Sequence, residues 1–146
     1  MIPLRKSLIG WMVLILIAAH IPYGPVGVSE AAEAQAQADG KPQFRNIDLF
    51  VAGTEGYHTF RIPTVLTTMD GILLAFAEGR KNSASDTGDI DLVLKRSLDG
   101  GTTWEPLQMV CDMGADTCGN PTAVQDEGNG RIWLFMNHNY GDDTIE

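Results

Sequence analysis

The sequence predicts an all-β fold, and three observations lead to that prediction. From residue 46 onward, short apolar runs alternate with turn residues, no stretch has a helical period, and the joints between runs are evenly spaced. Such runs suit a sandwich, a barrel or the blades of a propeller, and periodicity alone does not choose among these architectures.

The expected strands can be taken in order along the chain. In the run 60–67, alternation places Phe60 and Ile62 on one face and Arg61 on the other. The run 131–137 has large apolar residues on both faces, which is typical of a buried strand. Gly-, Asp- and Asn-rich joints at 69–71, 99–101 and 126–130 indicate turns, and a long polar joint covers 78–89. We therefore expect strands at 47–52, 60–67, 72–77, 90–97, 104–110, 120–125 and 131–137.

The beginning of the chain predicts export. Arg5 and Lys6 precede an apolar run over residues 8–19 that is too short to span a bilayer comfortably, and small residues follow at 32–38. An uncleaved membrane anchor is the alternative. We expect a secreted or periplasmic protein with no membrane span after processing. Its expected parts are a signal peptide and processing region over 1–36, a disordered linker over 37–45 and a folded domain over 46–146.

Charge and cysteine content exclude several classes of partner. The formal net charge of −9 makes nucleic acid and anionic membrane unexpected as bulk partners, although a local group of arginines can still hold an anion. Cys111 and Cys118 are the only cysteines, and an exported chain allows a bond between them worth about 2–3 kcal/mol. Free buried thiols are the alternative. Asp86, Asp89 and Asp91 lack the rest of a calcium loop, so no metal or cofactor is expected.

One turn has an unusually complete set of turn-forming residues. Residues 97–104 follow the pattern S-x-D-x-G-x-T-W between two expected strands. Asp99 can accept backbone N–H groups inside the turn, Gly100 or Gly101 can take positive φ, and Trp104 can bury its rings beneath the next strand. We therefore expect a structural role for Ser97, Asp99, Gly101 and Trp104.

This turn resembles the Asp-box of the sialidase (neuraminidase) family and of some other β-propellers. The F-R-I-P at 60–63 resembles the opening of a bacterial exo-sialidase, the segment 75–86 is similar to the family's first blade, and 117–121 with 131–134 resembles the start of the next blade. The resemblance covers roughly residues 47–146. At about 40–50 residues a blade, it implies an N-terminal fragment of about two blades of a six-bladed β-propeller.

The resemblance also implies an activity and roles for three residues. It implies an exo-α-sialidase, a glycoside hydrolase that releases terminal α-linked sialic acids from sialylated glycans with retention. Arg61 matches the first of three family arginines that grip the substrate carboxylate, and Arg80 would contact the sugar beside it. Asp86 would be the general acid, with a pKa raised by partial burial or by a neighbouring carboxylate; Asp89 and Asp91 either supply that repulsion or are simply solvated. A salt-bridged strand arginine and a loop-capping aspartate are the alternatives.

The nucleophile of the family is a tyrosine, because a carboxylate would be repelled by the carboxylate of the substrate. Tyr23, Tyr57 and Tyr140 are the tyrosines of the chain, and none stands at the matching position. We therefore expect the fragment alone to be inactive. The alternatives are a non-enzymatic Asp-box propeller that binds glycans or proteins, and a complete small secreted β-sandwich.

Overall fold

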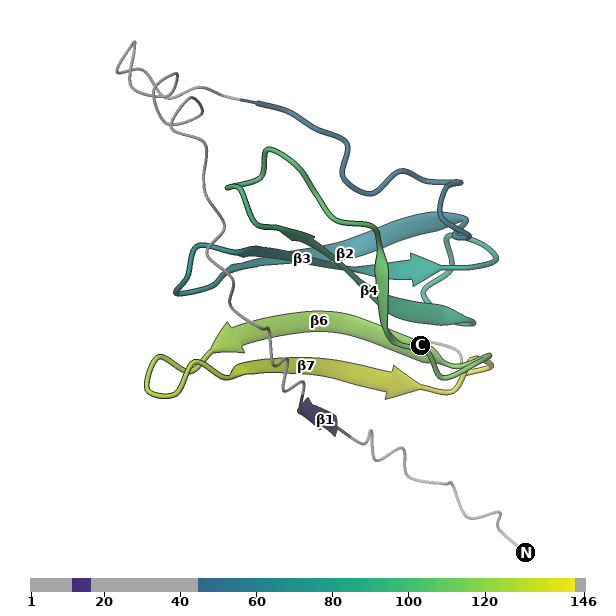
Figure 1. Cartoon of the computed structure of the whole chain (residues 1–146). Helices are drawn as coiled ribbons and strands as arrows, with labels where there is room; N and C mark the ends of the chain where they lie inside the picture. The colour runs from purple at the N-terminus through teal and green to yellow at the C-terminus, as the bar shows by residue number, and fades with distance from the viewer. Residues whose placement is uncertain (1–11, 17–44, 144–146) are drawn as a thin grey trace, which may run out of the picture. The chain divides into compact units, whose positions relative to one another are not determined.

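The computed structural model describes residues 12–16 and 45–143, and every regular element in that part of the chain is a β-strand (Figure 1). The chain divides into two compact units, residues 1–18 with 51–146 and residues 19–50. The described residues 45–50 of the second unit contain no strand. The strands of the first unit are β1 (Met12–Leu16), β2 (Thr59–Thr67), β3 (Leu73–Arg80), β4 (Ile90–Ser97), β5 (Gln108–Cys111), β6 (Thr117–Gln125) and β7 (Ile132–Asn139).

The strands form one sheet made of two antiparallel groups. In the first group β2 pairs with β3, β3 with β4 and β4 with β5, as consecutive antiparallel neighbours. The second group is the β6–β7 hairpin, which β1 joins on the outer side of β7. A single parallel pairing of Ile90 with Thr117 connects the two groups. Figure 1 shows β2, β3 and β4 together and the β6–β7 hairpin beside them.

The hydrophobic core lies where the two groups meet. β3 and β4 are buried along most of their lengths, as near-continuous apolar runs predict for strands that are covered on both faces. Leu92 and Val93 of β4 are completely buried. The main cluster draws residues from five strands: Leu74, Phe76, Leu92, Cys111, Cys118, Leu134 and Met136.

β2 and β6 carry the same irregularity. The pairing of β2 with β3 shifts between Arg61 and Thr64, and the pairing of β6 with β7 shifts between Gly119 and Thr122. In each case the residue before a proline has a φ of 51°, in the left-handed region. Proline has no N–H for the ladder, so a bulge is where a strand can accommodate it. Both bulges lie at the candidate site.

Two expected strands differ from the structure. No strand forms at 47–52, because consecutive turns begin there: Thr54 N–H donates to Val51 O and Tyr57 N–H to Thr54 O. The strand expected at 104–110 begins at Gln108, because Pro106 cannot donate to a ladder. The other expected strands overlap β2, β3, β4, β6 and β7, whereas β1 was not expected.

The expected signal peptide at 1–36 and linker at 37–45 lie outside the described residues, apart from β1 and residue 45. β1 falls within the apolar run of the expected signal peptide. Among the described residues, no helix has the length and apolar character needed to cross a membrane.

Candidate functional site

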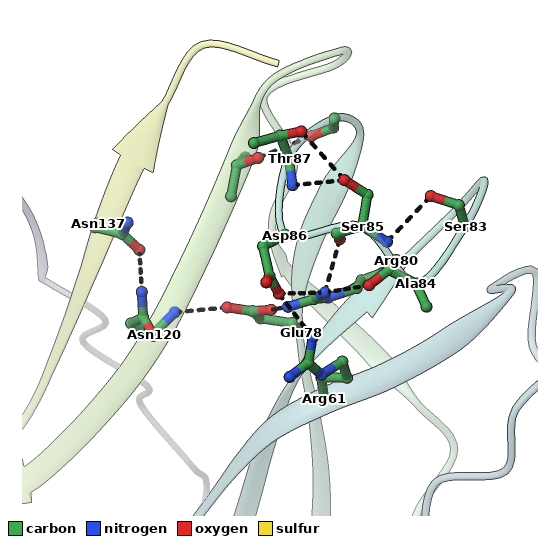
Figure 2. A network of polar contacts seen from close by, with 12 residues as sticks. Arg61, Glu78, Arg80, Ser83, Ala84, Ser85, Asp86, Thr87, Asn120 and Asn137 are labelled. Atoms are coloured by element: carbon green, nitrogen blue, oxygen red, sulfur yellow. Dashed lines mark hydrogen bonds and ion pairs between the residues drawn. The ribbon is translucent and has the colours of Figure 1, made fainter. Parts of the chain in front are cut away.

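The structure brings together three residues that the sequence singled out. Arg61 comes from β2, Arg80 ends β3, and Asp86 lies on the loop that leads to β4. Arg61 Nη1 and Arg80 Nη1 each lie 2.7 Å from Asp86 Oδ1 (Figure 2). The side chains of Arg61 and Asp86 are 46% and 57% exposed, whereas that of Arg80 is 3% exposed. The site therefore presents one accessible guanidinium and one accessible carboxylate.

The loop that carries Asp86 is folded by its own hydroxyl groups. Ser85 N–H donates to Ser83 Oγ at 3.1 Å, and Thr87 N–H donates to Ser85 Oγ at 3.2 Å. Arg80 Nη1 donates to the carbonyl oxygens of Ala84 and Ser85, both at 2.7 Å. Short hydroxyl side chains favour such local turns. The Ser-rich composition of the loop therefore fixes the backbone on which Asp86 stands.

The expected contact of Arg80 with the sugar stays a prediction, and the structure gives the protein partners of its guanidinium. It is buried, and Glu78 Oε2 accepts hydrogen bonds from its Nε at 3.1 Å and its Nη2 at 2.6 Å. Its Nη1 is engaged by Asp86 and the loop carbonyls. A guanidinium with partners on both edges has little capacity left for a ligand. Arg80 also joins the Asp86 loop to β3.

Glu78 extends this network to the second group of strands. Its Oε1 accepts the backbone N–H of Asn120 at 3.0 Å, and Asn120 Nδ2 donates to Asn137 Oδ1 at 3.1 Å. Figure 2 shows this continuous path from Asp86 to Asn137. Glu78 was not predicted from the sequence, although a carboxylate in a buried strand two residues before an arginine signals an ion pair.

The expected raised pKa of Asp86 is wrong for this structure. The hydrogen bond from Arg80, the charge of Arg80 and the charge of Arg61 hold the pKa of Asp86 below its ordinary value. Asp89 and Asp91 do not supply the expected repulsion, because both pair with Lys81 at 3.0 and 3.1 Å. Asp86 is therefore a carboxylate in this structure.

Tyr57 and Asp91 form a second buried polar pair. Tyr57 Oη donates to Asp91 Oδ2 at 2.7 Å, and Lys81 Nζ lies 3.1 Å from the same oxygen. Burial, and then the hydrogen bond to Asp91, raise the pKa of Tyr57 far above its ordinary value. A phenol held in this way stays protonated, so Tyr57 is a structural donor. Within the described ranges, no group of His, Cys, Asp and Glu side chains is arranged to hold a metal ion.

The turn after β4 is closed by the side chains of Ser97 and Asp99. Ser97 Oγ donates to Asp99 Oδ1 and accepts the N–H of Gly101, both at 2.8 Å. Asp99 also accepts the N–H and hydroxyl of Thr103 at 2.8 and 2.7 Å. The Thr103 hydroxyl is the main reason why the pKa of Asp99 falls to about 2. Gly100 and Gly101 have φ values of 67° and 89°, and Trp104 is half-buried.

Cys111 and Cys118 lie side by side in the core. Their sulfur atoms are 2.7 Å apart, and both side chains are buried as free thiols. Burial raises the pKa of the Cys118 thiol. The pair joins the end of β5 to the start of β6, and the possible disulfide stays a prediction, with free buried thiols as its alternative.

Comparisons with known proteins identify the family that this chain resembles. No protein-family model matches the chain. It is 39% identical over 139 residues to an exo-alpha-sialidase of Aspergillus fumigatus, covering 88% of this chain and 34% of that protein. It is 31% identical over 136 residues to a sialidase of Micromonospora viridifaciens, covering 90% of this chain and 21% of that protein.

A solved structure supports the same assignment. The Hadza microbial sialidase Hz136 superposes with a TM-score of 0.60 at 30% identity, over 66% of this chain and 21% of that one. The chain belongs to the sialidase family. It spans about a third or less of the length of the relatives that it matches. The predicted fold class, an all-β part of a sialidase-type propeller, is confirmed.

Proposed function

We propose that this chain supplies the general acid and one carboxylate-binding arginine of an exo-α-sialidase, which releases terminal α-linked sialic acids with retention. The observation that carries the proposal is the exposed pair of Arg61 and Asp86, 2.7 Å apart on neighbouring segments. The names of the relatives favour the same reaction, and sialylated glycans are the proposed substrates. Export of the protein is part of the proposal, on the pattern of its first residues.

Arg61 is the proposed ligand for the substrate carboxylate. A planar guanidinium binds a carboxylate through two parallel hydrogen bonds, and the Arg61 side chain is half exposed and reachable by a ligand. In the free chain Asp86 takes that place as the counter-ion. Binding of sialic acid would therefore exchange one carboxylate for another at Arg61.

That exchange provides a route by which Asp86 becomes an acid. When the substrate carboxylate takes Arg61, Asp86 loses one favourable cation and gains an anion nearby, and both changes raise its pKa. Enclosure by the sugar adds a desolvation penalty of the same sign. Asp86 would then be protonated in the complex, donate its proton to the leaving glycosidic oxygen and later activate water.

Arg80 is proposed to support the site from behind. It holds the loop through the carbonyls of Ala84 and Ser85 and adds positive potential beneath the position of the substrate carboxylate. Neither described tyrosine suits the nucleophile, because Tyr57 is buried against Asp91 and Tyr140 lies just beyond β7. We therefore expect the 146-residue chain alone to hydrolyse no sialoside.

A chimaera tests the proposal. The segment of the Aspergillus fumigatus exo-alpha-sialidase that matches this chain is replaced by residues 47–146, and release of sialic acid from sialyllactose is measured. We expect hydrolysis by the chimaera, a loss of about 10²–10⁴-fold in kcat for Asp86→Asn, and little change for Asp70→Asn in the β2–β3 turn. A folded chimaera that binds sialic acid and hydrolyses nothing would favour a glycan-binding module instead.

A further inference from the structure

The buried carboxylate of Glu78 lies between the two groups of strands. Glu78 sits on β3, two residues before Arg80, and its side chain is 4% exposed. Oε2 accepts from Nε and Nη2 of Arg80, and Oε1 accepts the backbone N–H of Asn120 on β6. Both oxygens are therefore engaged, one on each side of the boundary between the two groups.

The surroundings of Glu78 are shaped around this arrangement. A Cβ atom at Gly119 would lie 2.8 Å from Glu78 Oε1 and 2.9 Å from Asn137 Oδ1. Real Cβ atoms essentially never come so close to another atom, so glycine at this position leaves room for the carboxylate. The next residue, Asn120, has a φ of 51°, and this strained conformation belongs to the residue whose N–H meets Oε1. Strain of this kind persists where the surrounding structure over-determines it, often at functional sites.

The charges give Glu78 a second role. Arg80 is buried and interacts with two carboxylates, Glu78 on one edge and Asp86 on the other. The positive charge of a buried guanidinium requires a negatively charged partner. If one of the two carboxylates is removed, the other becomes the sole counter-ion of Arg80. With Glu78 present, Asp86 need not serve as the sole counter-ion of Arg80. A general acid benefits from this, because a carboxylate bound too tightly to a cation cannot take up a proton.

We infer that Glu78 is a positioning residue that holds the Arg80 guanidinium against the Asp86 loop, ties both to β6 through Asn120, and takes up part of the arginine's charge. Its contribution to catalysis rests on the proposed function. Its role in holding Arg80 and the Asp86 loop is a property of this chain by itself and can be tested without measuring activity.

The first test uses NMR on the 146-residue chain. Because Glu78 Oε2 accepts hydrogen bonds from both Nε and Nη2 of Arg80, rotation of the Arg80 guanidinium should be slow, with separately resolved Nη signals at neutral pH. Arg131, an exposed arginine near the start of β7, is the internal control and should give averaged signals. Averaged signals from Arg80 in the folded wild-type chain would overturn the inference, and this measurement needs no variant to fold.

The second test measures the pKa of Asp86 by titration of its carboxyl carbon. Glu78→Gln should move that pKa downward, because Asp86 becomes the sole counter-ion of Arg80, and Glu78→Asp should restore it by returning the charge. When Arg80 has already been replaced by Gln, Glu78→Gln should shift the pKa of Asp86 by a much smaller amount. An unchanged or raised pKa in Glu78→Gln, or an equal shift in both backgrounds, would contradict the inference.

The functional arm uses the chimaera described above. Glu78→Gln should lower the pKa of Asp86 and so move the alkaline limb of the kcat/KM profile to lower pH. At a fixed pH above that limb, kcat/KM should fall about tenfold for each unit by which the pKa of Asp86 is lowered. A parent chimaera that folds but is inactive would count against the proposed function, while the NMR results would still decide the role of Glu78. An active chimaera whose pH profile is unmoved by Glu78→Gln would count against Glu78 alone.

Discussion

The buried contact between Tyr57 and Asp91 allows a stability prediction to be worked from the structure. Tyr57→Phe removes one hydroxyl group, which donates to Asp91 Oδ2 at 2.7 Å, and leaves the ring in place. Tyr57 is 7% exposed and Asp91 is 2% exposed, so water does not readily replace the donor. A hydrogen bond to a charged group contributes about 1.5–3 kcal/mol. Lys81 Nζ remains 3.1 Å from the same oxygen, so we expect the lower figure.

A loss of about 1.5 kcal/mol corresponds to a fall in Tm of about 6–12 °C, at about 4–8 °C per kcal/mol for a domain of this size. The assay is thermal unfolding followed by circular dichroism at neutral pH. Tyr140→Phe is the matched control, because Tyr140 is 63% exposed and its hydroxyl removal should leave Tm nearly unchanged. Equal melting of Tyr57→Phe and the wild type would refute the view that the Tyr57 hydroxyl stabilises the fold through Asp91.

Three further predictions concern packing, pH and association. Gly79→Ala should destabilise the fold by about 1–3 kcal/mol in urea unfolding, because the new Cβ would lie 2.6 Å from the Tyr57 ring, while Gly128→Ala in the β6–β7 turn should be mild. The pKa of Asp99 is lowered to about 2, so the stability it contributes is present above about pH 4 and lost as the pH falls towards 2. Asp99→Asn should flatten the dependence of Tm on pH in that window, and an unchanged slope would contradict the assigned hydrogen bonds. Within the described residues β2 is an edge strand that pairs on one side with β3, and its Val65 is 61% exposed. Such an edge favours pairing with another copy of the chain, so Val65→Lys should raise the monomer fraction in sedimentation velocity.

The sequence predicted the strands best where one local pattern decides the structure. The apolar run of β4 was bounded correctly at Ile90–Ser97, because a polar loop precedes it and a complete turn follows. The strand expected at 47–52 was wrong, because its apolar residues are followed by Gly53, Glu55 and Gly56, all with positive φ. Turn geometry there outweighs the preference of the side chains for a strand.

The sequence singled out Arg61, Arg80 and Asp86, but neither Glu78 nor the contacts among these residues. The sequence shows Asp91 within an expected apolar strand, where it needs a partner, whereas Glu78 falls at the start of the polar joint expected at 78–89. It does not show which partner, because the pairing with Asn120 or Tyr57 spans more than thirty residues and depends on strand register. The low pKa of Asp86 was missed for the same reason, since it follows from two arginines on separate segments.

The most direct test of Asp86 as the proton donor compares two leaving groups in the chimaera. A general acid is needed to expel a sugar hydroxyl and is hardly needed for an aryl group that leaves as a stable phenolate. We predict that Asp86→Asn lowers kcat/KM for sialyllactose by about 10²–10⁴-fold while 4-nitrophenyl sialoside is hydrolysed at nearly the parent rate. Equal losses for both substrates would contradict the role assigned to this carboxyl group.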